Sequence, residues 1–189
     1  DMNYLDILND KYIGLSIVIY NFRRKYVDLV NKYIDDIFSS ITGLEGLKMI
    51  YTSNVSNLDN DMFKDKLKSN LSREIQYKIT FIGPNRDDFY FDLNGKNLSL
   101  YGSNGQIRSA VLALKLAEVK LFTDVLSDTP ILLLDDIFSE LDIDKRNKVI
   151  KYLDNDIQTI VTTTDIENID KNVRNKANVY RIENGKIIS

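Results

Sequence analysis

The chain has 189 residues, of which 43% are hydrophobic and 28% are charged, and its formal net charge is −3. It contains no cysteine and no histidine, which excludes disulfides, Cys–His catalysis and Ser–His–Asp catalysis and argues against a zinc site. No stretch approaches the ~18 apolar residues of a membrane-spanning helix, and no secretory signal is visible. The weak negative charge gives no overall attraction to nucleic acid, so DNA binding would need a local basic patch or residues outside this chain.

Residues 3–38 carry the strongest helical pattern. Apolar side chains recur there at alternating spacings of three and four, as in a coiled-coil seam, at Leu5, Leu8, Tyr12, Leu15, Ile19, Phe22, Tyr26, Leu29 and Tyr33. Such a helix would be roughly 50 Å long. One helix cannot bury this seam alone, and the later predicted helices are too short, so we expect its partner in sequence N-terminal to this chain. Arg23, Arg24 and Lys25 fan around the axis, which predicts a solvated face rather than a DNA-binding stripe.

The middle of the chain alternates between predicted strands and helices. The spacing of apolar residues predicts, in chain order, a strand at 47–51, a helix at 61–76, a strand at 78–82, and hairpin strands at 89–93 and 98–100. Asn94-Gly95 would join the hairpin strands, because Asn-Gly between alternating runs is a strong hairpin signal. We expect a helical arm domain at 1–76 and a second domain at 77–189.

Ser103 and Gly105 precede a long predicted helix that runs from about Gln106 to Leu126. Serine is a favourable N-cap, and the unpaired N–H groups at a helix start attract anions. Glycine lets the backbone approach a ligand closely. Taken alone, these residues are a helix cap and a turn; taken with a ligand, they form a phosphate-binding loop.

Ile131–Leu134 is an unbroken apolar run, which predicts a strand buried on both faces of a parallel sheet. The run ends in Asp135 and Asp136, and acids at the C-terminal ends of parallel strands lie where α/β sheets bind ligands. A carboxylate at such a place can bind Mg²⁺ together with phosphate oxygens.

A predicted helix at 144–153, with Asp142 or Asp144 as its cap, and a predicted strand at 158–164 follow this run. Strand, helix and strand in this order form a βαβ unit, which predicts an α/β fold with a parallel sheet. The chain closes with a predicted hairpin, whose strands are 179–182 and 186–188.

Together these segments resemble the motifs of an ABC-type ATPase. Ser103-Asn104-Gly105-Gln106 resembles the signature loop, Ile131–Asp136 the Walker B strand, and Ser139-Glu140-Leu141-Asp142 the D-loop. The finer resemblance is to the RecF family of bacterial DNA-repair ATPases. Gly83-Pro84-Asn85-Arg86-Asp87-Asp88 is similar to that family's Gly-Pro-His-Arg-Asp-Asp block, and Leu114–Glu118 is similar to a further family segment. Arg86, Asp87 and Asp88 could also be a salt-linked turn before the hairpin.

The resemblance implies that residues 77–189 are the C-terminal lobe of an ABC ATPase head, with a P-loop NTPase-like parallel sheet. It also implies that the signature residues Ser103, Gly105 and Gln106 contact the γ-phosphate of an ATP held by the other copy of the protein. Ser139 and Asp142 would be residues of the D-loop.

Three further residues receive roles from the resemblance. Asp135 would be the Mg²⁺-associated Walker B acid, and Asp136 would be catalytic, orienting or deprotonating the attacking water. Most ABC ATPases have Glu at the position of Asp136, and the shorter aspartate favours a slow ATPase. Thr164 would occupy the switch position, although it could equally be an ordinary β-branched strand residue.

The sequence contains no P-loop of the form Gly-x-x-x-x-Gly-Lys-Ser/Thr, because neither of its Gly-Lys pairs is followed by Ser or Thr. We therefore expect the C-terminal half of a larger protein, which does not hydrolyse ATP alone. The resemblance implies that the full-length cytoplasmic protein binds ATP and Mg²⁺, forms an ATP-dependent homodimer, and binds single-stranded or gapped DNA. It would act with recombination-mediator proteins in recombinational repair, replication and the SOS response. The alternatives are a degenerate or truncated head that serves as a dimerisation or protein-interaction module, and a head of the SMC type.

Overall fold

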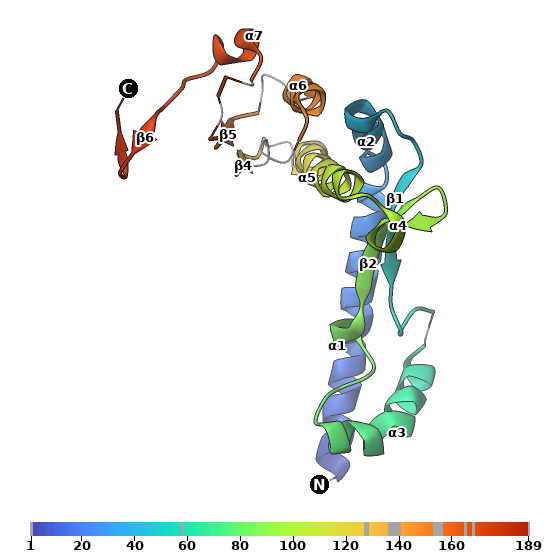
Figure 1. Cartoon of the computed structure of the whole chain (residues 1–189). Coiled ribbons are helices and arrows are strands. Elements are labelled where there is room, and N and C mark those ends of the chain that lie inside the picture. Colours follow the sequence, from blue (N-terminus) through green and yellow to red (C-terminus); the bar gives the residue numbers. More distant parts are fainter. Residues whose placement is uncertain are drawn as a thin grey trace. The chain divides into compact units, whose positions relative to one another are not determined.

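The computed structural model describes the chain at residues 2–57, 59–126, 129–135, 141–152, 157–164, 166–167 and 169–188. The chain forms two compact units, Asp1–Asp35 with Glu45–Gly102 and Asp36–Leu44 with Ser103–Ser189, which we describe separately. The predicted domain division at 76–77 falls inside the first unit and stays a prediction about the complete protein. Helices and strands are mixed along the chain (Figure 1), and among the described residues β4 and β5 pair in parallel. No helix in the described ranges is long and apolar enough to span a membrane.

The first unit begins with α1, Met2–Val30. A turn follows, and then α2, Ile34–Thr42, most of which belongs to the second unit. Asn31 lies at the break between α1 and α2. Its Nδ2 donates to the carbonyl of Met49 at 2.8 Å, and its Oδ1 accepts from the N–H of Met49 at 2.8 Å. An Asn side chain that bonds backbone in this way competes with helix formation. One continuous helix over 3–38 was therefore a wrong prediction, although most of the range is helical.

The first unit also contains an antiparallel sheet in the order β1-β2-β3, with bounds Leu47–Thr52, Asp88–Leu93 and Lys96–Asn97. Asn94 and Gly95 both have positive φ, as the turn favoured by Asn-Gly requires, so the predicted hairpin is confirmed. The second strand predicted at 98–100 was wrong, because the strand that pairs with β2 is β3 and residues 98–101 are helical. Asn97 accepts a hydrogen bond from the N–H of Ser99 at 2.9 Å and so starts a short helix, α4, at Leu98–Tyr101.

The helix predicted at 61–76 is confirmed as α3, Asn60–Tyr77, with the carboxylate of Asp59 as its cap. It packs against α1 (Figure 1), around a core of Ile13, Val55, Phe63 and Leu67. Several residues of the predicted seam on α1 stay exposed: Leu8 is 43% exposed, Leu15 64% and Phe22 71%. The α3 helix therefore covers part of α1, and a coiled-coil partner for the rest stays a prediction.

The strand predicted at 78–82 was wrong, because side chains satisfy the backbone groups that a strand would pair. The N–H of Phe81 donates to a carboxylate of α3 at 2.6 Å. The carbonyl of Ile82 accepts from the hydroxyl of Tyr12 at 2.8 Å. The segment thus stays irregular and leads into a short 3₁₀ helix, η1, at Pro84–Arg86.

The block 83–88 joins α1 to the sheet through one carboxylate. The Asp87 side chain is only 1% exposed, and its Oδ2 accepts from Arg23 Nη1 at 2.9 Å and from the hydroxyl of Tyr51. Arg23 also donates to the carbonyl of Pro84 at 2.6 Å. The other oxygen, Oδ1 of Asp87, is buried and has no hydrogen-bond partner among the described residues. We call this cluster of Arg23, Tyr51 and Asp87 the Asp87 clamp.

The clamp tests two expectations from the sequence. A salt link does form at this turn, but its cation is Arg23 on α1 and not Arg86, whose Nε donates to a backbone carbonyl. Arg23 therefore does not lie on a merely solvated face. Gly83, at φ 120° and ψ −176°, faces Tyr12 so closely that an added Cβ would meet the tyrosine hydroxyl and lie 2.7 Å from its Cζ. Only glycine fits this close approach.

The second unit is built on α5, Asn104–Leu126, which confirms the predicted long helix. Its middle is buried on most sides, at Ala110, Leu112, Ala113, Leu114, Leu116, Ala117 and Val119. From α6, Ile143–Tyr152, Lys148 reaches α2 and donates to the carbonyl of Ile41 at 3.3 Å. These elements form the helical part of the unit.

The predicted strand–helix–strand unit is confirmed, since β4 at Leu132–Leu134 pairs in parallel with β5 at Thr159–Val161, and α6 lies between them in sequence. However, Leu133 of β4 is 67% exposed while its two neighbours are buried, so the strand is covered on one face here and not on both as predicted. The chain continues through α7 and ends in the predicted hairpin, with bounds Lys171–Arg174 for α7, Ile182–Glu183 for β6 and Lys186–Ile187 for β7.

Candidate functional site

The start of α5 is closed by a reciprocal pair of side chains. The N–H of Gln106 donates to Ser103 Oγ at 3.3 Å, and the N–H of Ser103 donates to Gln106 Oε1 at 2.9 Å. This arrangement is a capping box, which fixes the first turn of the helix. Ser103 is exposed, and its hydroxyl, which acts as acceptor in the cap, keeps its own O–H as a possible donor to an anion.

A lysine that no sequence motif indicated, Lys145, lies beside Gly105 of the predicted signature loop and pairs with Asp142 of the predicted D-loop. Lys145 Nζ forms an ion pair with Asp142 Oδ2 at 2.9 Å and lies 3.9 Å from the position that a Cβ on Gly105 would occupy. Asp142, one of the two predicted caps, also caps α6, because its Oδ1 accepts a hydrogen bond from the N–H of Lys145 at 2.9 Å. The hydrogen bond from Lys145 is the main reason that the pKa of Asp142 lies below its ordinary value.

Asp135 follows β4 directly and is exposed. Its Oδ1 accepts a hydrogen bond from Thr162 Oγ1 at 2.5 Å, and Thr162 follows β5. The two side chains meet because Leu134 lies opposite Val161 in the parallel ladder, which places the next residues side by side. This register was the signal that could have predicted Thr162 as the neighbour of Asp135.

The predicted switch residue, Thr164, lies in an exposed bend two positions beyond Thr162. The predicted catalytic Asp136 and the D-loop residue Ser139 lie outside the described residues. The described part of the site therefore consists of two clusters in the second unit. One joins the signature loop to the D-loop through Lys145, and the other joins Asp135 to Thr162.

The donor set at Asp135 is compatible with Mg²⁺. Its carboxylate is an exposed, hard oxygen ligand at the end of a parallel strand. Mg²⁺ usually takes one or two carboxylates and completes its octahedron with phosphate oxygens and water. Among the described residues, no group of three or more Asp or Glu side chains lies close enough together to hold a metal ion.

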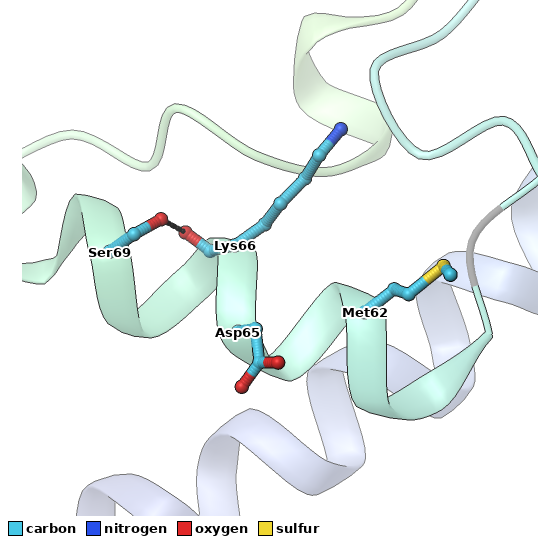
Figure 2. A pocket seen from close by; sticks show the side chains of 4 residues that line it. All are labelled: Met62, Asp65, Lys66 and Ser69. Carbon is cyan, nitrogen blue, oxygen red and sulfur yellow. Dashed lines mark hydrogen bonds between the residues drawn. The ribbon is translucent and has the colours of Figure 1, made fainter.

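A surface hollow of a different kind lies on α3 in the first unit (Figure 2). It is lined by Met62, Asp65, Lys66 and Ser69. Ser69 Oγ donates to the carbonyl of Lys66 at 2.9 Å, while Lys66 Nζ points away and donates to the carbonyl of Asn54 at 3.1 Å. These groups already serve the helix and its neighbouring loop, so the hollow has no convergent polar groups of the kind that orient a ligand.

Curated relatives decide the family. DNA replication and repair protein RecF of Lachnospira eligens is 36% identical over 189 residues, covering 100% of this chain and 51% of that protein. The protein of the same name in Lactobacillus acidophilus is 37% identical over 196 positions, covering 99% of this chain and 52% of the relative. The chain belongs to the RecF family. It spans about half the length of these relatives and corresponds to their C-terminal half. No family model matches the chain.

Solved structures agree with the RecF assignment and give the fold. The chain is similar to a structure of the recombination mediator protein RecF-ATPrS in the RecFOR pathway, with a TM-score of 0.80, 26% identity, and coverage of 99% of this chain and 50% of that one. An SMC head bound to the C-winged helix domain of ScpA has a TM-score of 0.51 at 16% identity, over 96% of this chain and 48% of that one, which shows the fold alone. The RecF-family chain thus has the fold of an ABC-type ATPase head.

Proposed function

We propose that this chain is the signature-bearing part of a RecF-type DNA replication and repair ATPase. In the complete protein, two heads would bind ATP between them, and the dimer would close on single-stranded or gapped DNA. Recombination-mediator proteins would be its partners in gap repair, in the cytoplasm. Residues 77–189 would then act as the C-terminal lobe of the head and residues 1–76 as its arm. The support is family membership together with the identity of a solved relative described as RecF-ATPrS.

The single observation that carries the proposal is the position of Lys145, which pairs with Asp142 and lies beside Gly105 at the start of α5. Lys145 brings the signature glycine, Gly105, and the D-loop acid, Asp142, into one cluster. Ser103 and Gln106 hold the helix start open to solvent in a fixed conformation. A rigid helix N-terminus with an exposed hydroxyl can receive the γ-phosphate of a nucleotide bound to the other copy.

The strand ends would serve the nucleotide of the same copy. Asp135 would associate with Mg²⁺, which when bound would screen the charge of the phosphates, and Thr162 would orient the carboxylate. Asp136 would orient or deprotonate the attacking water, and Ser139 would act with Asp142 in the D-loop. Thr164 would sense the phosphate from the switch position.

The test is ATP-dependent dimerisation of the full-length protein, with Ser103→Arg beside the wild type. The arginine would fill the space of the phosphate, so this variant should bind ATP as a monomer and fail to dimerise. Asp136→Asn should dimerise and fail to hydrolyse ATP. Unchanged dimerisation of Ser103→Arg would refute the signature role, and dimerisation without any hydrolysis by the wild type would favour a degenerate head acting as an interaction module.

A further inference from the structure

A lysine from the helix after the D-loop lies beside the signature glycine. Lys145 Nζ is 3.9 Å from the Cβ position of Gly105, and no atom of another element is nearer to that position. The same ammonium pairs with Asp142 Oδ2 at 2.9 Å, while the backbone N–H of Lys145 donates to Asp142 Oδ1 at 2.9 Å. All three residues belong to the second compact unit, so this geometry is internal to one part of the chain.

The pairing between Lys145 and Asp142 holds the ammonium without consuming it. A lysine ammonium has three N–H donors, and Asp142 takes one of them. The side chains of Lys145 and Asp142 are 28% and 57% exposed, and solvent-exposed pairs of this kind contribute little to stability. The contact also lowers the pKa of Asp142 below its ordinary value. The ammonium can therefore be shared with an incoming anion at small cost.

The position of the ammonium matters because of what else lies at the start of α5. Asn104 and Gly105 are in its first turn, where backbone N–H groups have no partner within the helix. The exposed hydroxyl of Ser103 lies at the cap. A lysine binds phosphate as a point charge, which complements the directional donors of a helix start. An anion at this place would meet backbone donors from α5 and a cation from α6.

We propose that Lys145 is a phosphate-binding residue of the signature site. It binds the γ-phosphate of the ATP held by the other copy, and Asp142 keeps its ammonium beside Gly105 until that phosphate arrives. This inference rests on the proposed function, in which the start of α5 receives that phosphate. It gives the D-loop acid a defined task, because Asp142 both caps α6 and positions the lysine.

The experiment uses the full-length protein and four variants. Lys145→Met removes the charge, Lys145→Arg keeps it, and Ser103→Arg is the benchmark for loss of the signature site. Lys120→Met is the matched control, because it removes the same charge from an exposed position of α5 about 22 Å further along the helix. The measurements are ATP affinity under monomeric conditions, and ATP-dependent dimerisation by sedimentation.

Lys145→Met should weaken ATP-dependent dimerisation by about 10- to 100-fold, the usual effect of losing one charge-assisted hydrogen bond. ATP affinity of the monomer should not change, Lys145→Arg should recover most of the dimerisation, and Lys120→Met should match the wild type. Normal dimerisation of Lys145→Met, with Ser103→Arg inactive, would overturn the role of Lys145 alone.

Two other outcomes would also count against the inference. If Lys145→Met and Ser103→Arg both dimerise normally, the proposed signature function falls as well. If Lys145→Met dimerises poorly but also shows faster hydrogen exchange at residues 141–146 without nucleotide, the lysine has a structural role and the phosphate-binding role is overturned.

Discussion

Replacing Gly83 by alanine should open the contact between α1 and the 83–88 block. Gly83 has φ 120° and ψ −176°, a region open almost only to glycine, so a side chain costs about 1–3 kcal/mol of backbone strain. The new Cβ would also meet the hydroxyl of Tyr12 and lie 2.7 Å from its Cζ. Tyr12 would have to move and lose its hydrogen bonds to the carbonyl of Ile82, at 2.8 Å, and to Asn85 Oδ1, at 2.9 Å.

The hydroxyl of Tyr12 has one proton, which these two acceptors share, so the loss of this shared hydrogen bond costs about 0.5–1.5 kcal/mol. The local free energy of opening should therefore fall by about 1.5–4.5 kcal/mol, which raises the exchange rate of protected amides by at least about 10-fold. The reporters are the N–H of Gly83, which donates to Asn54 Oδ1 at 3.0 Å, and the N–H of Arg86, which donates to the carbonyl of residue 83 at 3.0 Å. Hydrogen exchange of the full-length protein, followed by mass spectrometry, measures both.

Substitutions at two other glycines separate backbone strain from steric collision. Gly14 lies within α1 with no atom within 4 Å of its Cβ position, so Gly14→Ala should stabilise the helix by about 0.5–1 kcal/mol. Gly95 has φ 81° but open space around it, so Gly95→Ala isolates backbone strain from collision. The reasoning would be refuted if the amides at residues 83 and 86 exchanged at the wild-type rate in Gly83→Ala. It would also be refuted if their exchange accelerated no more than that of the amides around residue 95 in Gly95→Ala.

Two further predictions concern single hydrogen bonds. Burial, and then the hydrogen bond to Asp87, raise the pKa of Tyr51 to about 12 from its ordinary 10.0. Because the folded value is the higher one, the stabilisation is complete below about pH 10 and is lost as the pH rises towards 12; denaturation midpoints should fall over this interval in the wild type and much less in Tyr51→Phe. In the full-length protein, Thr162→Val removes the hydroxyl that donates to Asp135; on the proposed function it should weaken Mg²⁺-dependent ATP binding by about 10- to 100-fold, because Asp135 would lose the partner that orients it. Titration of Mg²⁺ against nucleotide binding, with Thr164→Val for comparison, would contradict this assignment if only the variant at 164 were affected.

The sequence predicted the elements whose own residues determine them. The helix of α5 and the turn at Asn94 follow from local periodicity and from a residue pair that tolerates positive φ. The parallel pairing of β4 with β5 follows from the order of strand, helix and strand. In these cases each residue's local preference agrees with the final fold.

The wrong predictions fall where a distant side chain replaces a backbone partner. Asn31 interrupts an otherwise continuous seam because it bonds Met49, which is 18 positions away. Residues 78–82 have a strand pattern, but the hydroxyl of Tyr12 on α1 donates to the carbonyl of Ile82, which in a sheet would pair with a neighbouring strand. No local pattern could reveal these contacts.

The candidate site divides in the same way. Ser103 and Asp142 were predicted as helix caps and both act as caps, since capping depends on the adjacent turn. Lys145 and Thr162 were missed because their importance comes from neighbours on other elements. Thr162 could have been found from the strand register, whereas Lys145 required the placement of α6 beside the start of α5.

The Asp87 clamp also sets an order of events during synthesis. Arg23 leaves the ribosome 64 residues before Asp87, the carboxylate that it pairs with. At bacterial elongation rates of roughly 5–20 residues per second this gap lasts about 3–13 s. During that interval α1 lacks this ion pair, and apolar side chains that the folded unit buries, such as Val27 and Val30, are exposed to water. The packing of α1 is therefore completed only after Asp87 has been synthesised.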